Sequence, residues 1–278
     1  MTPSEAERDR VRDAVLEAGR IAMRYFGRRH ESWHKGPGQI VTEADVAIDR
    51  YLHATLRRGC AEDGWLSEET EDDRLRLARR RVWVVDPIDG TRSFAEGTPE
   101  FAISVALLVE GRPVLGFVFN PATDELFEAA RGEGARLRGR TIRASDAARL
   151  EGARVCASRF ESRRWNFRAL LPEVELVTLG SLAYKLALVA AGRFDAYLSW
   201  RRSNDWDIAA AALLLEEAGA VLSDGAGRPV RLNLPEPSHE GLIAGPPALH
   251  AAVVAATATA YEGFRRGRDA VRIGPTGA

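Results

Sequence analysis

The sequence predicts a mixed α and β protein in two parts, an α+β domain over residues 1–147 and an α/β domain over residues 148–278. The first part opens with two apolar patterns of helical period and continues with short strand-like runs. From about residue 150 strands and helices alternate instead, which is typical of a different layered arrangement. A chain of 278 residues is also long enough for about two domains of ordinary size.

Two helices are expected near the N-terminus. Ser4 and Glu7 form an S-x-x-E capping box ahead of a stripe of apolar residues at helical spacing. The stripe consists of Val11, Ala14, Val15, Ala18, Ile21, Ala22, Tyr25 and Phe26. The charged residues 28–38, which end in Gly-Pro-Gly, are expected to form a loop, and a second helix is expected over about residues 42–57.

Short runs of apolar residues predict the strands of the first part. They cover residues 64–67, 82–85, 101–109, 114–119 and 125–129. Gly111 and Pro113 in "VEGRPV" indicate a hairpin between two of these strands.

In the second part strands and helices are expected in turn. The strands are "ARVCASR", "FDAYLSW" and "AVLS", and the helices cover residues 181–191 and 207–218, with Gly219 closing the second helix.

Composition excludes several classes of protein. The 39 basic and 40 acidic residues give a net charge of −1, which offers no field for nucleic acid or an anionic membrane. Charged residues recur through Arg24, so a secretory signal is not expected and the protein is expected to be cytoplasmic. Residues 242–261 carry no formal charge, but Pro246 and Pro247 interrupt them, and a packed helix is expected rather than a membrane span. Cys60 and Cys156 are expected to be unpaired.

Four acidic motifs are candidates for a site, and each has an ordinary structural explanation. In "VWVVDPIDGTRSF", Asp86 and Asp89 follow an apolar run, and "DPIDG" alone could be a turn. In "VTEAD", Asp45 could simply complete a capping box with Thr42. "LSEET" could be an exposed acidic loop, and Asp207 could favour the first turn of its helix through the helix dipole.

Other chemistries lack their minimum parts. The five histidines are His30, His34, His53, His239 and His250, and no H-E-x-x-H or Cys/His cluster occurs, which argues against zinc. The sequence also contains no G-x-S-x-G elbow, no P-loop and no complete G-x-G-x-x-G after a strand.

The order of the motifs resembles that of the inositol monophosphatase family. Lys35 with "VTEAD" is followed by "LSEE", "DPIDGT", "GSLAYKLALVAAGRFDA" and "WDIAAA" with "EEAGA", so the resemblance covers about residues 10–255. It implies a layered α-β-α-β-α sandwich of the inositol monophosphatase/fructose-1,6-bisphosphatase type and magnesium-dependent hydrolysis of small phosphomonoesters.

The resemblance also implies roles for individual residues. The expected metal ligands are Glu68, Asp86, the carbonyl oxygen of Ile88, Asp89 and Asp207. Gly90 and Thr91 would bind the phosphate, and Asp45 would pair with Thr91. Two carboxylates about 4 Å apart repel by roughly 4 kcal/mol at an effective dielectric near 20, so such a cluster requires cations. Because the ligands are all oxygen, hard ions such as Mg²⁺ are favoured, in two or three copies.

The expected mechanism is in-line attack by a metal-activated water without a phosphoenzyme. Thr91 would assist, and Asp45 or Glu68 would accept the proton. Glu68 is expected to be the ligand and Glu69 a neighbour, although the sequence does not separate their roles.

Substrate preference depends on one departure from the family pattern. Inositol-specific members carry a glutamate six residues before the tryptophan of W-D, where this chain has Trp200. With "CASRF" and "GSLAYK", the segment "YLSWRRSNDWD" is more similar to the 3′(2′),5′-bisphosphate nucleotidase branch. Trp200 would then stack on a base, unless it is a core residue. The basic side chains expected to hold a second phosphate are Arg201, Arg202, Arg159 or Lys185.

The favoured substrate is therefore 3′-phosphoadenosine 5′-phosphate, with inositol 1-phosphate or another sugar or histidinol phosphate as the alternative. The family also includes non-catalytic partners of RNA or the transcription machinery, a further alternative that the near-zero charge does not favour. The resemblance implies inhibition by Li⁺, and it leaves a homodimer open.

Overall fold

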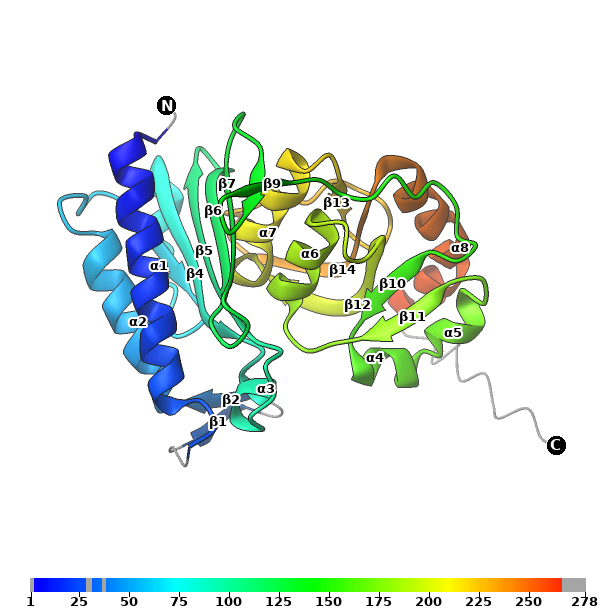
Figure 1. Ribbon diagram of the computed structural model, residues 1–278, viewed down its shortest axis with the longest axis horizontal. Helices are drawn as coiled ribbons and strands as arrows, with labels where there is room; N and C mark the ends of the chain where they lie inside the picture. Colours follow the sequence, from blue (N-terminus) through cyan, green and yellow to red (C-terminus); the bar gives the residue numbers. More distant parts are fainter. Residues whose placement is uncertain (1–2, 29–31, 37–38, 267–278) are drawn as a thin grey trace.

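A computed structural model describes residues 3–28, 32–36 and 39–266. The expected layering of helices and sheets is confirmed (Figure 1). Helices α1 (Glu5–Tyr25) and α2 (Glu43–Leu56) cover one face of a seven-stranded sheet. Helices α6 (Leu182–Ala190) and α7 (Asp205–Glu217) separate this sheet from a five-stranded sheet. Helix α8 (Pro247–Arg265) covers the outer face of the second sheet.

The first sheet has the order β3-β4-β5-β6-β7-β8-β9. Its strands are β3 (Gly64–Ser67), β4 (Arg81–Asp89), β5 (Ala102–Val109), β6 (Arg112–Asn120), β7 (Glu125–Ala130), β8 (Ala135–Leu137) and β9 (Arg140–Ile142). Strands β3 and β4 are parallel and the other neighbours are antiparallel. Alternate residues of β4 face opposite sides: Trp83 and Val85 pack with α1 and α2, whereas Val82 and Val84 pack with α6 and α7.

The second sheet has the order β11-β10-β12-β14-β13. Its strands are β10 (Arg154–Ala157), β11 (Glu175–Thr178), β12 (Ala196–Asn204), β13 (Val221–Ser223) and β14 (Ser238–Gly245). One face shares a core with the first sheet through α6 and α7, and the other packs against α8. The change of sheet occurs between Ile142 and Arg154, and the domain boundary near residue 147 stays a prediction because the two halves share this core.

Most expected elements occur within a few residues of their expected bounds. The Ser4 side chain accepts a hydrogen bond from the Glu7 N–H, as a cap should, and the β5–β6 hairpin turns through Glu110 and Gly111, both with positive φ. Helix α7 begins two residues earlier than expected, at Asp205. Cys60 and Cys156 are free, as expected.

Several short elements were not expected. They are β1 (Ser32–Gly36), β2 (Gln39–Thr42), the 3₁₀ helix η1 (Leu75–Ala78), α4 (Arg159–Arg164) and α5 (Phe167–Leu170), together with β8, β9, β11 and β14. The short helix α3 (Thr91–Ala95) lies within "DGTRSF", a segment whose sequence favours the start of a helix. The loop expected over residues 28–38 is wrong in part, because β1 lies within it and pairs with β2. Residues 29–31 and 37–38 and the side chain of Lys35 lie outside the described part. None of the described helices has the length and apolar character needed to cross a bilayer.

Candidate metal centre and active site

Asp86 and Asp89 lie at the end of β4, which continues to Asp89 rather than turning after Asp86. Side chains of a regular strand alternate, so residues three apart would face opposite sides of the sheet. Here Asp86 lies opposite Ser104 and Asp89 opposite Ala102, so β4 contains one residue more than β5 over this stretch. The bulge therefore places both carboxylates on the same side of the sheet. The alternative that "DPIDG" is only a turn is therefore wrong, because Asp86 to Asp89 belong to a bulged strand.

Asp207 reaches the same place from the first turn of α7. Asn204 and Asp207 form a capping box in which the Asn204 N–H donates to Asp207 Oδ2 at 2.6 Å. The helix lies close to the first sheet, because a Cβ at Gly116 would lie only 2.6 Å from the Ala210 carbonyl oxygen. The Ser104 hydroxyl also donates to the Trp206 carbonyl at 3.1 Å. These contacts fix the start of α7 against β5 and β6.

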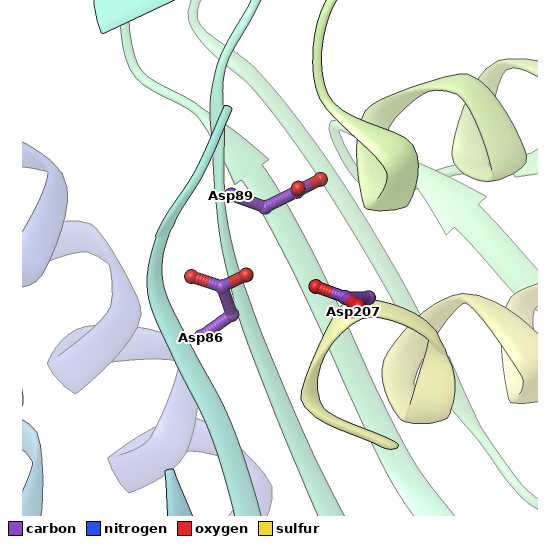
Figure 2. Close-up of side chains that lie close together, drawn as sticks. All are labelled: Asp86, Asp89 and Asp207. Carbon is purple, nitrogen blue, oxygen red and sulfur yellow. The ribbon is translucent and has the colours of Figure 1, made fainter. Parts of the chain in front are cut away.

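Asp86, Asp89 and Asp207 converge (Figure 2), and one oxygen from each lies within 4.8 Å of the others. Each carboxylate has one oxygen held by the protein. Asp86 Oδ1 accepts from the Ile88 N–H at 3.1 Å, Asp89 Oδ2 from Ser181 and the Ala183 N–H, and Asp207 Oδ2 from Asn204. Asp86 Oδ2 is buried without a hydrogen-bond partner in the described structure. A buried carboxylate oxygen left in this way fits a cation ligand.

Glu68 completes the acidic group from the end of β3. Its N–H donates to the Val85 carbonyl at 3.4 Å, which places it beside β4. Burial, together with the smaller effects of the charges of Asp207, Glu69 and Asp89, raises the pKa of Glu68 to about 8. The sequence predicts that Glu68 is the metal ligand and Glu69 its neighbour, and these two roles stay predictions.

Burial also raises the pKa values of the three aspartates. The pKa of Asp86 lies well above its usual value, with Glu68 and Asp89 adding to the effect. Burial raises the pKa of Asp207 to about 7, opposed by the Asn204 N–H and by the charge of Arg201. The pKa of Asp89 also rises on burial, opposed by the Ser181 hydroxyl and by Lys185. Four acidic groups packed together, with Asp86 and Asp89 buried and Glu68 and Asp207 half-buried, are unfavourable as anions unless cations join them.

Asp45 has two contacts that serve different purposes. Its Oδ2 accepts from the N–H and hydroxyl of Thr42 at 2.8 and 2.6 Å, which completes the capping box of α2. Its Oδ1 lies 3.3 Å from the Thr91 hydroxyl, which is also 3.0 Å from the Ile88 carbonyl. Burial raises the pKa of Asp45 to about 6. The capping explanation and the pairing with Thr91 are therefore compatible.

Gly90 precedes α3 with a φ of 92°, a left-handed conformation that favours glycine. A Cβ there would lie 2.8 Å from the Glu100 carbonyl oxygen and 3.2 Å from Ser181 Cα. The close approach keeps the Gly90–Thr91 backbone beside the segment that holds Asp89. Phosphate binding by Gly90 and Thr91 stays a prediction.

Comparison with known proteins decides the family. A sequence profile of the Inositol monophosphatase family matches residues 7–262. The chain belongs to the inositol monophosphatase family. It is 39% identical over 230 residues to an inositol-1-monophosphatase of Rhizobium meliloti, covering 78% of this chain and 85% of that one.

Two further proteins of the family extend the comparison. The chain is 34% identical over 206 residues to the Nus factor SuhB of Salmonella typhimurium, covering 71% of this chain and 76% of that one. The solved structure of a Thermotoga maritima inositol monophosphatase superposes with a TM-score of 0.82 at 30% identity, covering 92% of this chain and 98% of that one. These names are those of inositol monophosphatases and SuhB, and they lend no support to the nucleotidase branch.

The structure corrects the prediction that Trp200 stacks on a purine. Trp200 is 1% exposed and packs among the rings of Trp165, Phe167, Tyr261 and Phe264. It lies on the face of β12 that points to α8, away from α6 and α7. The alternative reading of Trp200 as a core residue is the correct one.

The four basic candidates differ in their surroundings. Lys185 is buried, and its ammonium donates to the carbonyls of Leu179 and Gly180, so its role as a direct phosphate ligand is not supported by its position. Arg159 pairs with Glu100 at 2.7 Å, and Arg202 lies 3.6 Å from Glu236. Arg201 is exposed, and its charge opposes the rise in the pKa of Asp207 that burial causes.

Two positioning glutamates escaped sequence reasoning. Glu161 is buried, and its carboxylate accepts from the Ser199 hydroxyl and from the N–H groups of Trp200 and Arg201. The S-x-x-E pattern from Ser158 to Glu161 could have revealed it as a helix start. Glu100 accepts from the Gly180 N–H at 2.7 Å and thereby steadies the segment next to Ser181. No local pattern distinguishes Glu100.

The raised pKa values predict an unusual pH dependence of stability without metal. Carboxyls such as Glu68 and Asp207 bind protons more tightly when folded than in the unfolded chain, where their pKa is about 4. Their contribution is complete below that value and is lost as the pH rises through about 7 to 8. We expect the free energy of unfolding in EDTA to decrease from pH 5 to pH 8, measured by urea denaturation.

Two controls accompany this measurement. Saturating Mg²⁺ should abolish the decrease, and Asp207→Asn should reduce it in EDTA because one of the titrating groups is gone. A free energy of unfolding that stays constant or rises over this interval in EDTA would contradict the electrostatic description of the cluster.

Proposed function

We propose that the protein is a Mg²⁺-dependent phosphomonoesterase acting on a small phosphorylated metabolite. The observation that carries the proposal is the convergence of the buried Asp86 and Asp89 with the half-buried Asp207, together with an unpartnered buried oxygen on Asp86. Membership of the inositol monophosphatase family supports the same activity. The proposed ligands are Glu68, Asp86, the Ile88 carbonyl, Asp89 and Asp207, a set of oxygen donors suited to Mg²⁺.

Bound Mg²⁺ would supply a water of lowered pKa and would neutralise the charge that develops on the phosphate and the leaving oxygen. The chain's own groups hold and move the proton. The Thr91 hydroxyl lies between Asp45 Oδ1 and the Ile88 carbonyl, so it can orient a water beside the phosphate. Asp45, with a pKa near 6, can accept the proton close to neutral pH. Gly90 and the N–H groups that begin α3 would face the phosphate.

We propose an inositol phosphate rather than 3′-phosphoadenosine 5′-phosphate as the preferred substrate. The relatives named as inositol monophosphatases support this choice, and the burial of Trp200 removes the ring that would have held the base. One observation argues against this choice: the chain has Trp200 where inositol-specific members carry a glutamate. Glu161 cannot replace that glutamate, because its carboxylate accepts from the N–H groups of Trp200 and Arg201 in β12. Relaxed selectivity among polyol phosphates is the expected result of that loss.

A side-by-side assay of specificity constants tests the substrate. Inositol 1-phosphate should exceed 3′-phosphoadenosine 5′-phosphate by about tenfold or more in kcat/KM, which corresponds to ~1.4 kcal/mol. Fructose 1,6-bisphosphate and histidinol phosphate belong in the same series, since relatives use such phosphoesters. A tenfold preference for the nucleotide would reject the substrate proposal and keep the phosphatase. Hydrolysis of none of them with Mg²⁺ present would reject both.

The similarity to the Nus factor SuhB supports a second candidate function. In this function the protein would bind RNA or a protein partner without catalysing a reaction. The described site retains all of its acidic side chains, which favours catalysis. Very slow hydrolysis of every substrate together with tight retention of RNA or a protein partner in a pull-down would support the second candidate instead.

A further inference from the structure

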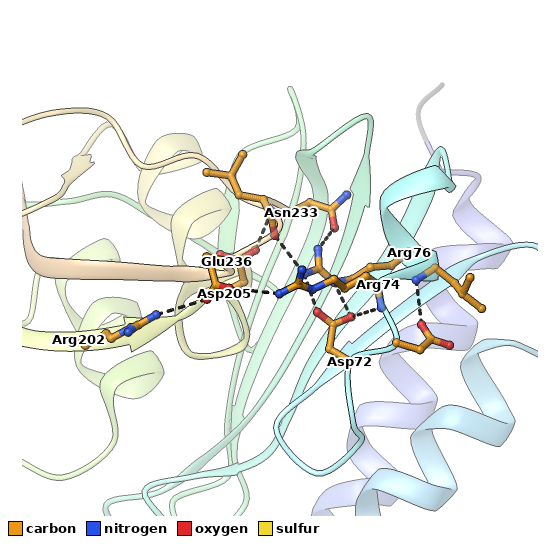
Figure 3. A network of polar contacts seen from close by, with 10 residues as sticks. Asp72, Arg74, Arg76, Arg202, Asp205, Asn233 and Glu236 are labelled. Atoms are coloured by element: carbon orange, nitrogen blue, oxygen red, sulfur yellow. Dashed lines mark hydrogen bonds and ion pairs between the residues drawn. The ribbon is translucent and has the colours of Figure 1, made fainter.

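Two of the proposed metal ligands come from opposite halves of the chain. Contacts between the two halves must therefore hold these ligands at a fixed distance from each other. Glu68 follows β3 in the first sheet, whereas Asp207 lies in α7 beyond the second sheet's β12. The segments next to them are joined by a network of polar contacts (Figure 3). Its inner members are Asp72, Arg76, Asn233 and Asp205.

Arg76 is the centre of the network. Its side chain is 0% exposed, an unusual state for a guanidinium. Asp72 accepts from Nε at 3.0 Å and from Nη2 at 2.8 Å. Asn233 Oδ1 accepts from Nη1 at 2.6 Å, and the Leu234 carbonyl accepts from Nη2 at 3.0 Å. All three guanidinium nitrogens are therefore engaged, and the charge joins two segments more than 150 residues apart in sequence.

Asp205 continues the connection to α7. It is 0% exposed and accepts from the Asn233 N–H at 2.6 Å and from His239 Nε2, 2.8 Å away. Asp205 precedes Asp207 by two residues in the same helical turn. Asp72 follows Glu68 by four residues. The contacts Asp72–Arg76–Asn233–Asp205 thus form an unbroken path between the two segments that carry the ligands, in which Arg76 and Asp205 are buried and Asp72 and Asn233 are half-buried.

We propose that Arg76 is a positioning residue that sets the separation of Glu68 and Asp207 and thereby the affinity for Mg²⁺. The inference rests on the proposed function, since it assumes that both residues are ligands. Asp86 and Asp89 lie on β4 and do not contact this network. Loss of Arg76 therefore loosens Glu68 and Asp207 against each other and leaves the two β4 carboxylates in place.

The outer part of the network does not share this role. Glu236 bridges Arg74 and Arg202 at 3.3 and 3.6 Å, but all three side chains are largely exposed. Exposed ion pairs contribute little to stability because water screens them. A positioning role requires the inner contacts, which centre on the buried Arg76 and Asp205.

The test is Arg76→Met, which keeps the length of the side chain and removes its charge and hydrogen bonds. The Mg²⁺ concentration for half-maximal activity should rise about 10-fold, the lower end of the effect of losing an outer contact to a metal ligand, because Arg76 acts on the ligands through Asp72 and Asn233 rather than touching them. At saturating Mg²⁺, kcat should stay near that of the unaltered protein. Direct Mg²⁺ titration by calorimetry, without substrate, should show the same loss of affinity.

Arg131→Met is the matched control. Arg131 makes two contacts of 2.7 and 2.9 Å with Glu216 and one of 2.8 Å with the Pro113 carbonyl, at the end of α7 opposite to Asp207. It should lower the melting temperature without changing Mg²⁺ affinity. If both variants bind Mg²⁺ as tightly as the unaltered protein and differ from it only in a lower melting temperature, Arg76 is only structural and the proposal is overturned.

Two further variants make the outcome decisive. If Arg76→Met does not fold, Asn233→Gly removes only the Oδ1 contact and suits the φ of 59° at this position, so it should weaken Mg²⁺ binding in the same direction. Unchanged binding in this variant would reject the proposal. Asp207→Asn separates the two hypotheses: if it too leaves Mg²⁺ binding unchanged, the proposed function fails, and otherwise only the role of Arg76 fails.

Discussion

Replacing Asp89 by asparagine is expected to lower kcat by at least about 10²-fold, the scale of one lost electrostatic contact in a transition state. The substitution keeps the shape of a side chain that Ser181 and Ala183 already hold, but it removes the negative charge shared with Asp86 and Asp207. Asp207→Asn is expected to have an effect of similar size, since its capping contact with Asn204 can persist through the amide oxygen. Steady-state rates at saturating Mg²⁺ and substrate measure both.

Asp63→Asn is the control for this experiment. Asp63 is a buried carboxylate that accepts from Trp83 Nε1 at 2.9 Å and from Arg81 Nε at 3.0 Å, outside the acidic cluster. It should affect stability but leave kcat close to that of the unaltered protein. Full activity of Asp89→Asn, or activity that survives chelation of divalent ions, would remove the metal hypothesis. Ca²⁺ should inhibit the unaltered protein and so, by family resemblance, should Li⁺.

The second large effect is expected for Asp45→Asn, with a loss in kcat of about 10²- to 10⁴-fold, the usual contribution of a general base. Asparagine can direct its amide oxygen to the Thr42 N–H and hydroxyl, where Asp45 Oδ2 lies now, so the cap of α2 is retained. Its amide nitrogen would then face Thr91 and could not accept a proton. The melting temperature should therefore change little.

Asp45→Ala provides the comparison, because it removes both functions. It should lose activity to a similar degree and, in addition, about 0.5–2 kcal/mol of stability with the cap. Thermal melts and rates per folded molecule separate the two effects. If Asp45→Asn retains its turnover per folded molecule, Asp45 is a cap residue alone and another group accepts the proton.

The sequence predicted those features that local patterns encode. Helix α1, the strand before Asp86 and the hairpin at Gly111 follow from period and turn residues, and the acidic motifs follow from their family resemblance. The convergence of Asp207 with Asp86 depends on α7 packing against the first sheet, a contact between residues far apart that no local pattern contains.

The prediction that Trp200 stacks on a purine failed for a related reason. Trp200 ends an alternating apolar run, and alternation alone does not show which face of the strand meets the cleft and which meets α8. The buried Arg76 was overlooked similarly, since an arginine in a charged loop is ordinarily a surface residue. Its partners, Asn233 and Leu234, lie in a distant loop that the sequence did not connect to it.

The bulge in β4 has a consequence for how this chain can diverge. Asp86 and Asp89 share a side of the sheet because the bulge takes up the one extra residue between them. A relative that lacked one of the two intervening residues would still present both carboxylates on that side, opposite Ser104 and Ala102, because residues two apart in a regular strand share a face. It would lose one backbone unit, however, and with it the carbonyl at Ile88 that accepts from the Thr91 hydroxyl, so the extra residue matters for the backbone oxygen that it presents.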